Sequence, residues 1–268
     1  MEDRISYLKE KANNIRINII ESLYRAKSGH PGPALSIVEI VTVLYFSEMN
    51  LNQRIKDRLV LSKGHGVAAI YGALTELGLI DKEELYTLRK IGSRLQGHPD
   101  MTKLPLLDAG TGALGQGLSI AIGYALAARL LNSPSRVYCI IGDGETQEGQ
   151  IWEAAMFAPV QKLDSIVVIL DNNKLQNEAS VVNTLSIEPI ADRWNSFGWK
   201  VISIDGHDIS QIKMAFAVAR DTKEKPTIIV ANTVKGKGIP FMENNMAWHS
   251  KTLEKDEYTR ALEYLKRV

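Results

Sequence analysis

Apolar residues along this chain follow two periods, one typical of strands and one typical of helices. Runs of aliphatic residues predict buried strands over 137–141, 166–170, 200–204 and 227–230, with a shorter apolar stretch over 58–61. Apolar positions three and four residues apart predict helices over 3–27, 35–47, 66–77, 117–131, 151–160, 190–197 and 210–220. Residues 81–90 indicate a solvent-exposed helix, and a last amphipathic helix follows the loop after Asn232.

The order of these elements predicts the fold class. Strands that alternate with helices form a parallel sheet whose two faces are covered by those helices. We therefore expect an α/β fold with helices on both faces of a parallel sheet. The 268 residues contain no repeat or linker, so a single domain over 1–268 is expected. The glycine-rich stretch 92–117 is irregular, and a long irregular loop in a compact domain is usually functional.

Composition excludes several classes of function. Apolar residues make up 45% of the chain and charged residues 24%, which is ordinary for a soluble protein. The formal net charge of +1 favours neither nucleic acid nor an anionic membrane as a partner. The longest apolar stretch, 118–131, is too short to cross a bilayer. The charged N-terminus is unlike a signal peptide, and the single cysteine, Cys139, lies in a predicted buried strand, so a cytoplasmic protein is expected.

Two polar clusters stand where buried strands should end. Gly142-Asp143-Gly144 follows one apolar run, and Asn172-Asn173 follows the next. Ligands of open α/β sheets bind at that edge, and oxygen ligands there suit a hard divalent cation that holds a diphosphate. Gly-Asp-Gly alone is more often a turn. Two such clusters thirty positions apart (173 minus 143), each after a β-branched run, favour the binding site.

Four of the five histidines lie in loops beside glycine, proline or serine. A histidine in such a loop can point into a cleft, and it titrates near neutral pH. Any one of them alone would more often be a surface or capping residue. The fifth, His207, is assigned to a turn at a strand end. Zinc is disfavoured because no His-x-x-x-His or Cys-x-x-Cys spacing occurs. The four loop histidines are His30, His65, His98 and His249.

Residues 110–115 match the dinucleotide fingerprint Gly-x-Gly-x-x-Gly. That interpretation needs a strand before the glycines and an acidic residue about twenty positions later for the ribose. Pro105 precedes the segment, and no Asp or Glu occurs between Gly115 and Asp143. A nicotinamide or flavin fold is therefore disfavoured.

Taken in order, these motifs resemble the thiamine diphosphate enzymes and, among them, the transketolase family. The family carries Ser-Gly-His-Pro-Gly, Gly-His-Gly and Gly-His-Pro loops, then Thr-Gly-Pro-Leu-Gly-Gln-Gly and the metal motif. The same order occurs here, and the similarity covers most of residues 15 to 250. The matching segments are 28–32, 64–66, 97–99, 111–117, 142–144, 148–149, 172–173, 232–238 and 248–249.

The resemblance implies a thiamine diphosphate-binding fold and assigns roles to the cofactor-side residues. Asp143, Asn173 and the backbone carbonyl of Leu175 would hold Mg²⁺, or Ca²⁺ or Mn²⁺ in its place. His65 and Gly144 would contact the diphosphate, as would Asn173 through the metal. The residues that would line the cofactor near its aminopyrimidine are Gly112, Ala113 and Leu114.

The resemblance also implies which residues act on the substrate. His30, His98 and His249 would face the sugar and handle its hydroxyl protons, and His249 would also reach the diphosphate. Glu148 would join a carboxylate network at the interface with a partner domain.

Two departures from the family pattern affect the expected site. Ala113 stands where the family usually has proline, which loosens the loop. Residues 177–180 read Asn-Glu-Ala-Ser where most transketolases continue with an Asp-Gly turn. This segment borders the cofactor, so the usual sugar phosphate is placed in doubt.

In transketolases the glutamate that activates the cofactor lies in a second, pyrimidine-binding domain. This chain ends at Val268, close to where the family's diphosphate-binding domain ends. We therefore expect an N-terminal subunit of a split transketolase, without the pyrimidine and C-terminal domains. A separate C-terminal subunit would complete the site, in an α2β2 heterotetramer. Together they would transfer a two-carbon ketol unit from a ketose, phosphorylated or not, to an aldose, as in pentose phosphate metabolism.

Two other interpretations stay open at this point. The chain could be a component of a related thiamine diphosphate enzyme, either deoxyxylulose phosphate synthase-like or of the dehydrogenase type. The three sugar-facing histidines disfavour the dehydrogenase. It could also be a non-catalytic regulatory subunit, although the intact Asp143, Asn173 and His65 disfavour such a loss of function.

Overall fold

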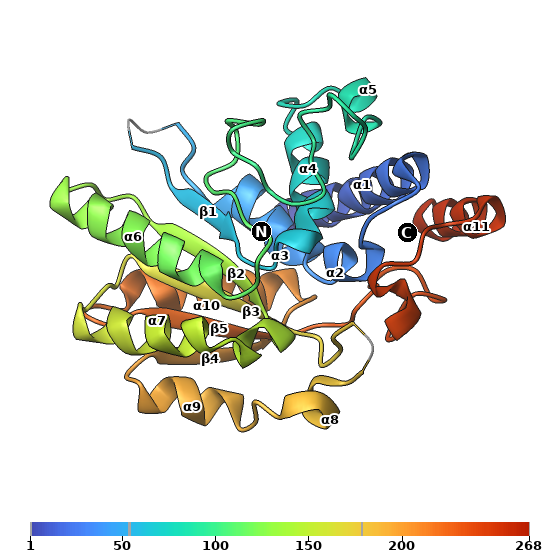
Figure 1. Cartoon of the computed structure of the whole chain (residues 1–268). Helices are drawn as coiled ribbons and strands as arrows, with labels where there is room; N and C mark the ends of the chain where they lie inside the picture. The colour runs from blue at the N-terminus through green and yellow to red at the C-terminus, as the bar shows by residue number, and fades with distance from the viewer. Residues whose placement is uncertain (1, 53–54, 178, 268) are drawn as a thin grey trace.

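The chain folds around a five-stranded sheet in which every neighbouring pair of strands is parallel. The computed structural model describes residues 2–52, 55–177 and 179–267. The strands lie in the order β1-β2-β3-β5-β4 (Figure 1). The predicted fold class is confirmed. The strand bounds are β1 Arg58–Leu61, β2 Val137–Gly142, β3 Ile166–Asn172, β4 Lys200–Asp205 and β5 Thr227–Asn232.

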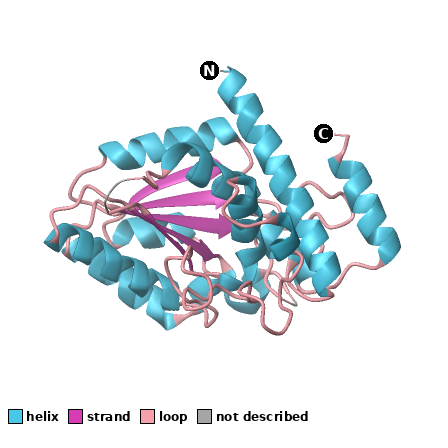
Figure 2. Cartoon of the chain, turned by 90° about the horizontal axis from the view of Figure 1, so that it is seen from above, coloured by secondary structure: helices cyan, strands magenta, loops and turns pink. Residues whose placement is uncertain are grey.

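Helices cover both faces of the sheet, which is seen between them in Figure 2. One face carries α1 Glu2–Ala26, α2 Pro31–Leu35, α3 Val38–Val43, α4 Val67–Glu76, α10 Ile209–Asp221 and α11 Lys255–Leu265. The other carries α6 Gln116–Leu130, α7 Gly149–Val160, α8 Val181–Leu185 and α9 Ile190–Ser196. The remaining helical segments are α5 Lys82–Leu85, η1 Leu44–Glu48, η2 Gly64–Gly66, η3 Gly144–Gln147 and η4 Met246–His249. Across the described residues, none of the helices combines the length and the apolar composition needed to cross a membrane.

Each strand divides its side chains between two separate cores. In β3, Val167 and Ile169 pack into the core beneath α1, α3 and α10. Their neighbours Ile166, Val168 and Leu170 pack into the core beneath α6 and α7. Because successive residues of a strand point to opposite faces, a strand buried on both faces reads as a continuous apolar run. This is why the runs in the sequence located the strands closely.

The structure departs from the predicted helices in three places. The helix expected over 35–47 is divided into α2, α3 and η1, because Ser36 uses its hydroxyl to bond the carbonyl of Pro33 and the Asp171 carboxylate and turns the chain. Within 81–90 only α5 is helical, and Arg89 has a φ of 61°, which a helix cannot continue. Helix α8 was not expected, because its five residues are too few to show a period.

The start of α6 lies against the loop that follows β1. Gly115, with a φ of 86°, precedes the helix, and the amide of Gly117 donates to the Ser62 hydroxyl at 3.1 Å. A Cβ at position 117 would lie 2.5 Å from the Cβ of Ser62 and 2.6 Å from its Cα. Only glycine allows this approach, which brings two of the predicted site loops together.

Substitution of Gly117 by alanine should destabilise the isolated chain by about 1–3 kcal/mol, since the new methyl group overlaps backbone atoms of Ser62. Gly123 of the same helix is the matched control, because a Cβ there meets no atom within 4 Å. Gly123→Ala should be neutral or stabilising by up to about 1 kcal/mol, because alanine favours the helix. Urea unfolding measures the change in the free energy of unfolding for both variants. Equal changes would contradict the close packing of Gly117 against Ser62.

Candidate active site

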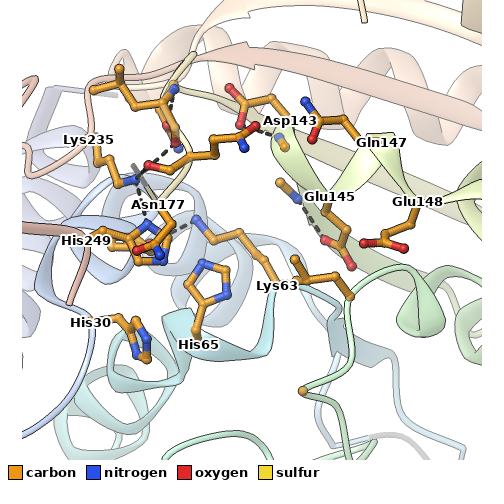
Figure 3. Close-up of a pocket in the computed structure, with 18 of the residues that line it drawn as sticks. His30, Lys63, His65, Asp143, Glu145, Gln147, Glu148, Asn177, Lys235 and His249 are labelled. Carbon is orange, nitrogen blue, oxygen red and sulfur yellow. Dashed lines mark hydrogen bonds between the residues drawn. The ribbon is translucent and has the colours of Figure 1, made fainter. Parts of the chain in front are cut away.

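The predicted site loops meet at the carboxyl edge of the sheet. Because the strands are parallel, the segments after β1, β2, β3 and β5 leave the sheet on the same side. Together with the loops that carry His30, His98 and His249, they enclose a cavity of about 410 Å³. Figure 3 shows His30, His65 and His249 on one side of this cavity, with Asp143, Gln147 and Glu148 on the other.

The three groups expected to hold a metal lie together on this edge. Asp143 and Asn173 are buried, and both line the cavity with Leu175. Asp143 accepts hydrogen bonds from the amides of Gly144, at 2.7 Å, and Lys174. The Asn173 Oδ1 accepts from the Leu175 amide at 3.1 Å, and its Nδ2 donates to Asp171 at 2.8 Å. Each oxygen retains a lone pair for a further ligand.

Burial raises the pKa of the Asp143 carboxyl to about 7, with the nearby Asp171 carboxylate acting in the same direction. The two backbone amides and Lys63 oppose this shift without cancelling it. A cation next to Asp143 would favour its ionised form and remove most of this cost.

The four loop histidines form one cluster. The ring of His30 lies 5.4 Å from that of His65, 5.5 Å from His249 and 6.2 Å from His98, measured between centroids. The rings of His65 and His249 are stacked at 5.2 Å. Residues that are up to 219 positions apart in the chain (249 minus 30) thus share one cavity. The structure brings together all four histidines that the sequence singled out.

The histidines in this cluster are electrically neutral at physiological pH. Burial, aided by the nearby Arg89 charge, lowers the pKa of His30 to about 4. Burial, aided by the Lys235 charge, lowers the pKa of His249 to about 3. Burial, aided by the Lys63 charge, holds the pKa of His65 well below its usual value. The pKa of His98 is lowered for the same two reasons as that of His30. A neutral imidazole can donate a hydrogen bond from one ring nitrogen and accept one at the other.

Lys63 lines the cavity, and sequence reasoning did not single it out. Its side chain is 2% exposed and forms an ion pair with Asp171, which is fully buried. Its ammonium also donates to the carbonyl of Pro33 at 3.0 Å. Lys63 is therefore a buried cation in the wall of the cavity. A lysine beside a glycine-rich loop usually lies on the surface, so the sequence carried no signal for its burial.

Lys235 was also missed, although its segment was part of the resemblance. Its ammonium donates to the carbonyls of Leu175 and Gln176, each at 3.0 Å, and to the His249 Nδ1 at 2.8 Å. Three partners satisfy all three of its donors and leave the proton of neutral His249 on Nε2. Burial, reinforced by Lys63, lowers the pKa of Lys235 to about 8. Lys235 thus links the loop after Asn173 to the histidine cluster.

Glu145 is a third residue that the sequence did not single out. Its carboxylate accepts the amides of Gly115 and Gly142, each at 2.9 Å, and the hydroxyl of Ser62. Burial raises its pKa. One buried carboxylate therefore joins the loops after β1 and β2 to the start of α6.

The other predicted residues lie around the opening of the cavity. Gly112, Leu114 and Gly144 line it. Ala113 lines an adjacent cavity of about 480 Å³ that shares Gly112 and His98 with the first. Glu148 is exposed at the rim, directly before α7. His207 lies outside the cavity, next to Glu39.

This fold and site define a thiamine diphosphate-binding domain. Residues 8–265 match the family model described as transketolase, thiamine diphosphate binding domain. The crystal structure of transketolase from Campylobacter jejuni superposes with a TM-score of 0.90 at 32% identity, over 97% of this chain and 42% of that one. The chain therefore belongs to the transketolase family, and the identification from the motifs is confirmed.

Relatives of two lengths are similar to the chain. It is 42% identical to the 6-deoxy-6-sulfo-D-fructose transketolase subunit SqwG of Clostridium sp. (strain MSTE9), over 97% of this chain and 96% of that subunit. It is 37% identical to an apulose-4-phosphate transketolase subunit of Phocaeicola vulgatus, over 97% of this chain and 94% of that one. It is 40% identical to human transketolase, but it spans only 41% of that protein.

Acidification should destabilise the isolated chain, in part through His30. The folded-state pKa of about 4 lies below the ordinary value of 6.5, so the unfolded chain binds the proton more tightly between these values. The contribution of neutral His30 to the free energy of unfolding is therefore full above pH 6.5 and is lost as the pH falls towards 4. His30→Asn should make this loss less steep in urea unfolding at a series of pH values. An NMR titration that places the pKa of His30 at or above 6.5 would contradict the assignment.

Proposed function

We propose that this chain is the diphosphate-binding subunit of a two-subunit transketolase. With a separate partner it would transfer a two-carbon ketol unit from a ketose to an aldose. The observation that carries the proposal is the cavity in which Asp143, Asn173 and Leu175 face a cluster of four histidines. When bound, thiamine diphosphate supplies the carbanion chemistry that cleaves and forms the carbon–carbon bond.

The residues of the cavity fit a metal-bound diphosphate. The buried carboxylate of Asp143 has a raised pKa and lacks a cationic side chain bonded to it within the described residues. Lys63 and Lys235 add positive charge around the same cavity. The Oε1 atom of Gln176 and the Nδ1 atom of His30 are buried without a hydrogen-bond partner in the described residues. A bound molecule would supply hydrogen-bond partners for these two atoms.

In the proposed complex, Asp143, Asn173 and the carbonyl of Leu175 would hold Mg²⁺, with Ca²⁺ or Mn²⁺ as substitutes. His65 and Gly144 would contact the diphosphate. Gly112, Ala113 and Leu114 would lie along the rest of the cofactor. These assignments follow the family motif, and the burial of Asp143 and Asn173 supports them.

The histidines would act on the sugar. His30, His98 and His249 are neutral, so His30 and His98 can each accept a hydroxyl proton on one ring nitrogen while the other donates. On His249 the Lys235 ammonium occupies Nδ1, which leaves the Nε2 proton to donate to a hydroxyl or phosphate oxygen. The unpartnered Nδ1 of His30 is available as an acceptor.

The partner would supply the pyrimidine-binding domain. Two relatives that this chain matches over nearly their whole lengths are named as transketolase subunits, which supports a separate partner. The exposed Glu148 at the rim would face that partner in a carboxylate network. A two-fold arrangement with two shared sites gives an α2β2 heterotetramer.

Substitution Asp143→Ala should weaken Mg²⁺-dependent binding of thiamine diphosphate by at least about 100-fold, because the diphosphate loses the charged ligand of its cation. The fold should survive, since Asp143 lies at a strand end. Calorimetric titration of the chain mixed with its partner measures the affinity, and Asp221→Ala, at the far end of α10, is the control. Unchanged affinity of the Asp143 variant would refute the metal assignment.

The activity itself is tested by mixing. The purified chain alone should show no ketol transfer with saturating thiamine diphosphate and magnesium, because in this proposal the partner supplies the other side of the cofactor site. Addition of the C-terminal transketolase subunit from the same organism should produce turnover. Robust turnover by the isolated chain would overturn the two-subunit proposal. Cofactor binding by the mixture without turnover on any ketose would favour a regulatory subunit.

A further inference from the structure

A buried carboxylate outside the cavity joins three elements. Glu39 of α3 forms an ion pair with Arg16 of α1 through one oxygen, and its other oxygen lies 3.0 Å from the His207 Nδ1. Arg16 and Glu39 are 7% and 8% exposed. The Arg16 guanidinium and the His207 hydrogen bond together lower the pKa of Glu39 to about 2, against the opposing effect of burial. Glu39 is therefore a carboxylate at every physiological pH.

The hydrogen bonds of His207 fix its tautomer. Its Nε2 accepts the backbone amide of Val234 at 2.8 Å, so this nitrogen carries no proton. The proton of the neutral ring is then on Nδ1, where it is donated to Glu39. His207 therefore links the buried carboxylate of Glu39 to the backbone that follows β5.

Arg16 holds the same backbone three residues further on. Its Nε donates to the carbonyl of Lys237 at 3.1 Å, while its Nη2 donates to Glu39. A Cβ at Gly238 would lie 2.6 Å from this Nε, and Gly238 has a φ of 95°. Glycine is required for the backbone to come this close. One carboxylate therefore fixes both ends of the segment 234–237.

The segment so held carries Lys235. Its side chain enters the cavity and bonds to the carbonyls of Leu175 and Gln176 and to His249, as Figure 3 shows. Two backbone–backbone hydrogen bonds join the segment 234–237 to the rest of the described chain. The amide of Gly236 donates to the carbonyl of Gly32 at 3.1 Å, and the amide of Asn244 donates to the carbonyl of Lys235 at 2.9 Å. Among the described residues, four hydrogen bonds therefore hold the backbone of this segment, and the side chains of Arg16 and His207 make two of them.

We propose that Arg16, Glu39 and His207 form a clamp that positions Lys235 in the cofactor cavity. These three are positioning residues, because none of them lines the cavity. A buried ion pair is weak evidence for stability, and apolar side chains would fill the same space at lower cost in desolvation. What apolar side chains cannot do is bond the amide of Val234 and the carbonyl of Lys237. The effect on the cofactor rests on the function proposed above, whereas the clamp itself does not.

The clamp is tested first on the full chain alone, by hydrogen exchange followed by mass spectrometry or NMR. His207→Leu removes both hydrogen bonds and should speed exchange of the Val234 amide at least tenfold. His207→Gln should restore most of the protection, because its amide oxygen can accept from Val234 while its nitrogen donates to Glu39. Thr42→Ala is the matched control, because Thr42 lies on α3 near Glu39 and is buried, and its hydroxyl donates to the carbonyl of Val38 within the same helix.

Three outcomes of the exchange experiment would overturn the clamp. The first is unchanged Val234 exchange in His207→Leu, the second is the same increase in Thr42→Ala, and the third is the absence of rescue by glutamine. A ¹⁵N NMR spectrum that places the His207 proton on Nε2 would also overturn it.

The consequence for the site is tested with the partner present. The dissociation constant of thiamine diphosphate should rise at least fivefold in His207→Leu and return towards the wild-type value in His207→Gln, with little change in turnover at saturating cofactor. The same loss in Thr42→Ala would overturn the positioning role. If the unaltered chain with its partner binds no thiamine diphosphate, the proposed function fails, while the exchange data still decide on the clamp.

Discussion

The carboxylate of Asp171 is the point on which the geometry of the site depends. It lies at the end of the central strand β3, fully buried, and it accepts hydrogen bonds from four side chains. Ser36 comes from the turn between α2 and α3, Lys63 from the loop after β1, Asn173 from the loop after β3 and Thr233 from the segment after β5. Removal of one partner from a buried ion pair costs about 3–5 kcal/mol, so the interaction with Lys63 strongly constrains these loops. Asp171 accepts a hydrogen bond from the Nδ2 of Asn173, so the Oδ1 of that amide points away from Asp171.

Charge in the cavity is arranged around an anionic ligand. Burial, together with the charges of Lys63 and Lys235, lowers the pKa of His65 and His249, so that positive charge is concentrated on two ammonium groups. Burial raises the pKa of the Asp143 carboxyl to about 7, and a nearby cation would favour its ionised form. In the proposed complex, a diphosphate with a divalent cation would fit this distribution of charge, because the cation would compensate Asp143 and the two ammonium groups would attract the phosphates. In the same proposal, the neutral histidines would contact the hydroxyl groups of the sugar. Membership of the transketolase family and this distribution of charge therefore lead to the same ligand.

The sequence predicted the sheet and the histidine cluster well, for a physical reason. A strand buried on both faces must be apolar throughout, so β1 was located with the same bounds as observed, and β2 and β3 differ only at their ends. Loop histidines beside glycine are unusual enough to be noticed. Lys63, Glu145 and Lys235 were missed because their roles depend on partners far away in the chain, such as the 108 positions between Lys63 and Asp171. The break between α2 and α3 was missed for the same reason, since the Ser36 hydroxyl bonds to Asp171 across 135 positions. Local patterns identify elements, whereas long-range hydrogen bonds decide how those elements end.

The placement of the single cysteine gives the chain an intrinsic reporter. Cys139 lies in β2, between β1 and β3, and is completely buried. Burial raises the pKa of its thiol, so the small amount of thiolate present in the folded chain is shielded from reagents. Labelling by a maleimide or a disulfide reagent then requires the sheet itself to separate. The rate of labelling therefore measures opening of the core rather than fraying of loops, and it needs no engineered residue. Added ligand or partner will slow that rate only to the extent that it stabilises the central strands.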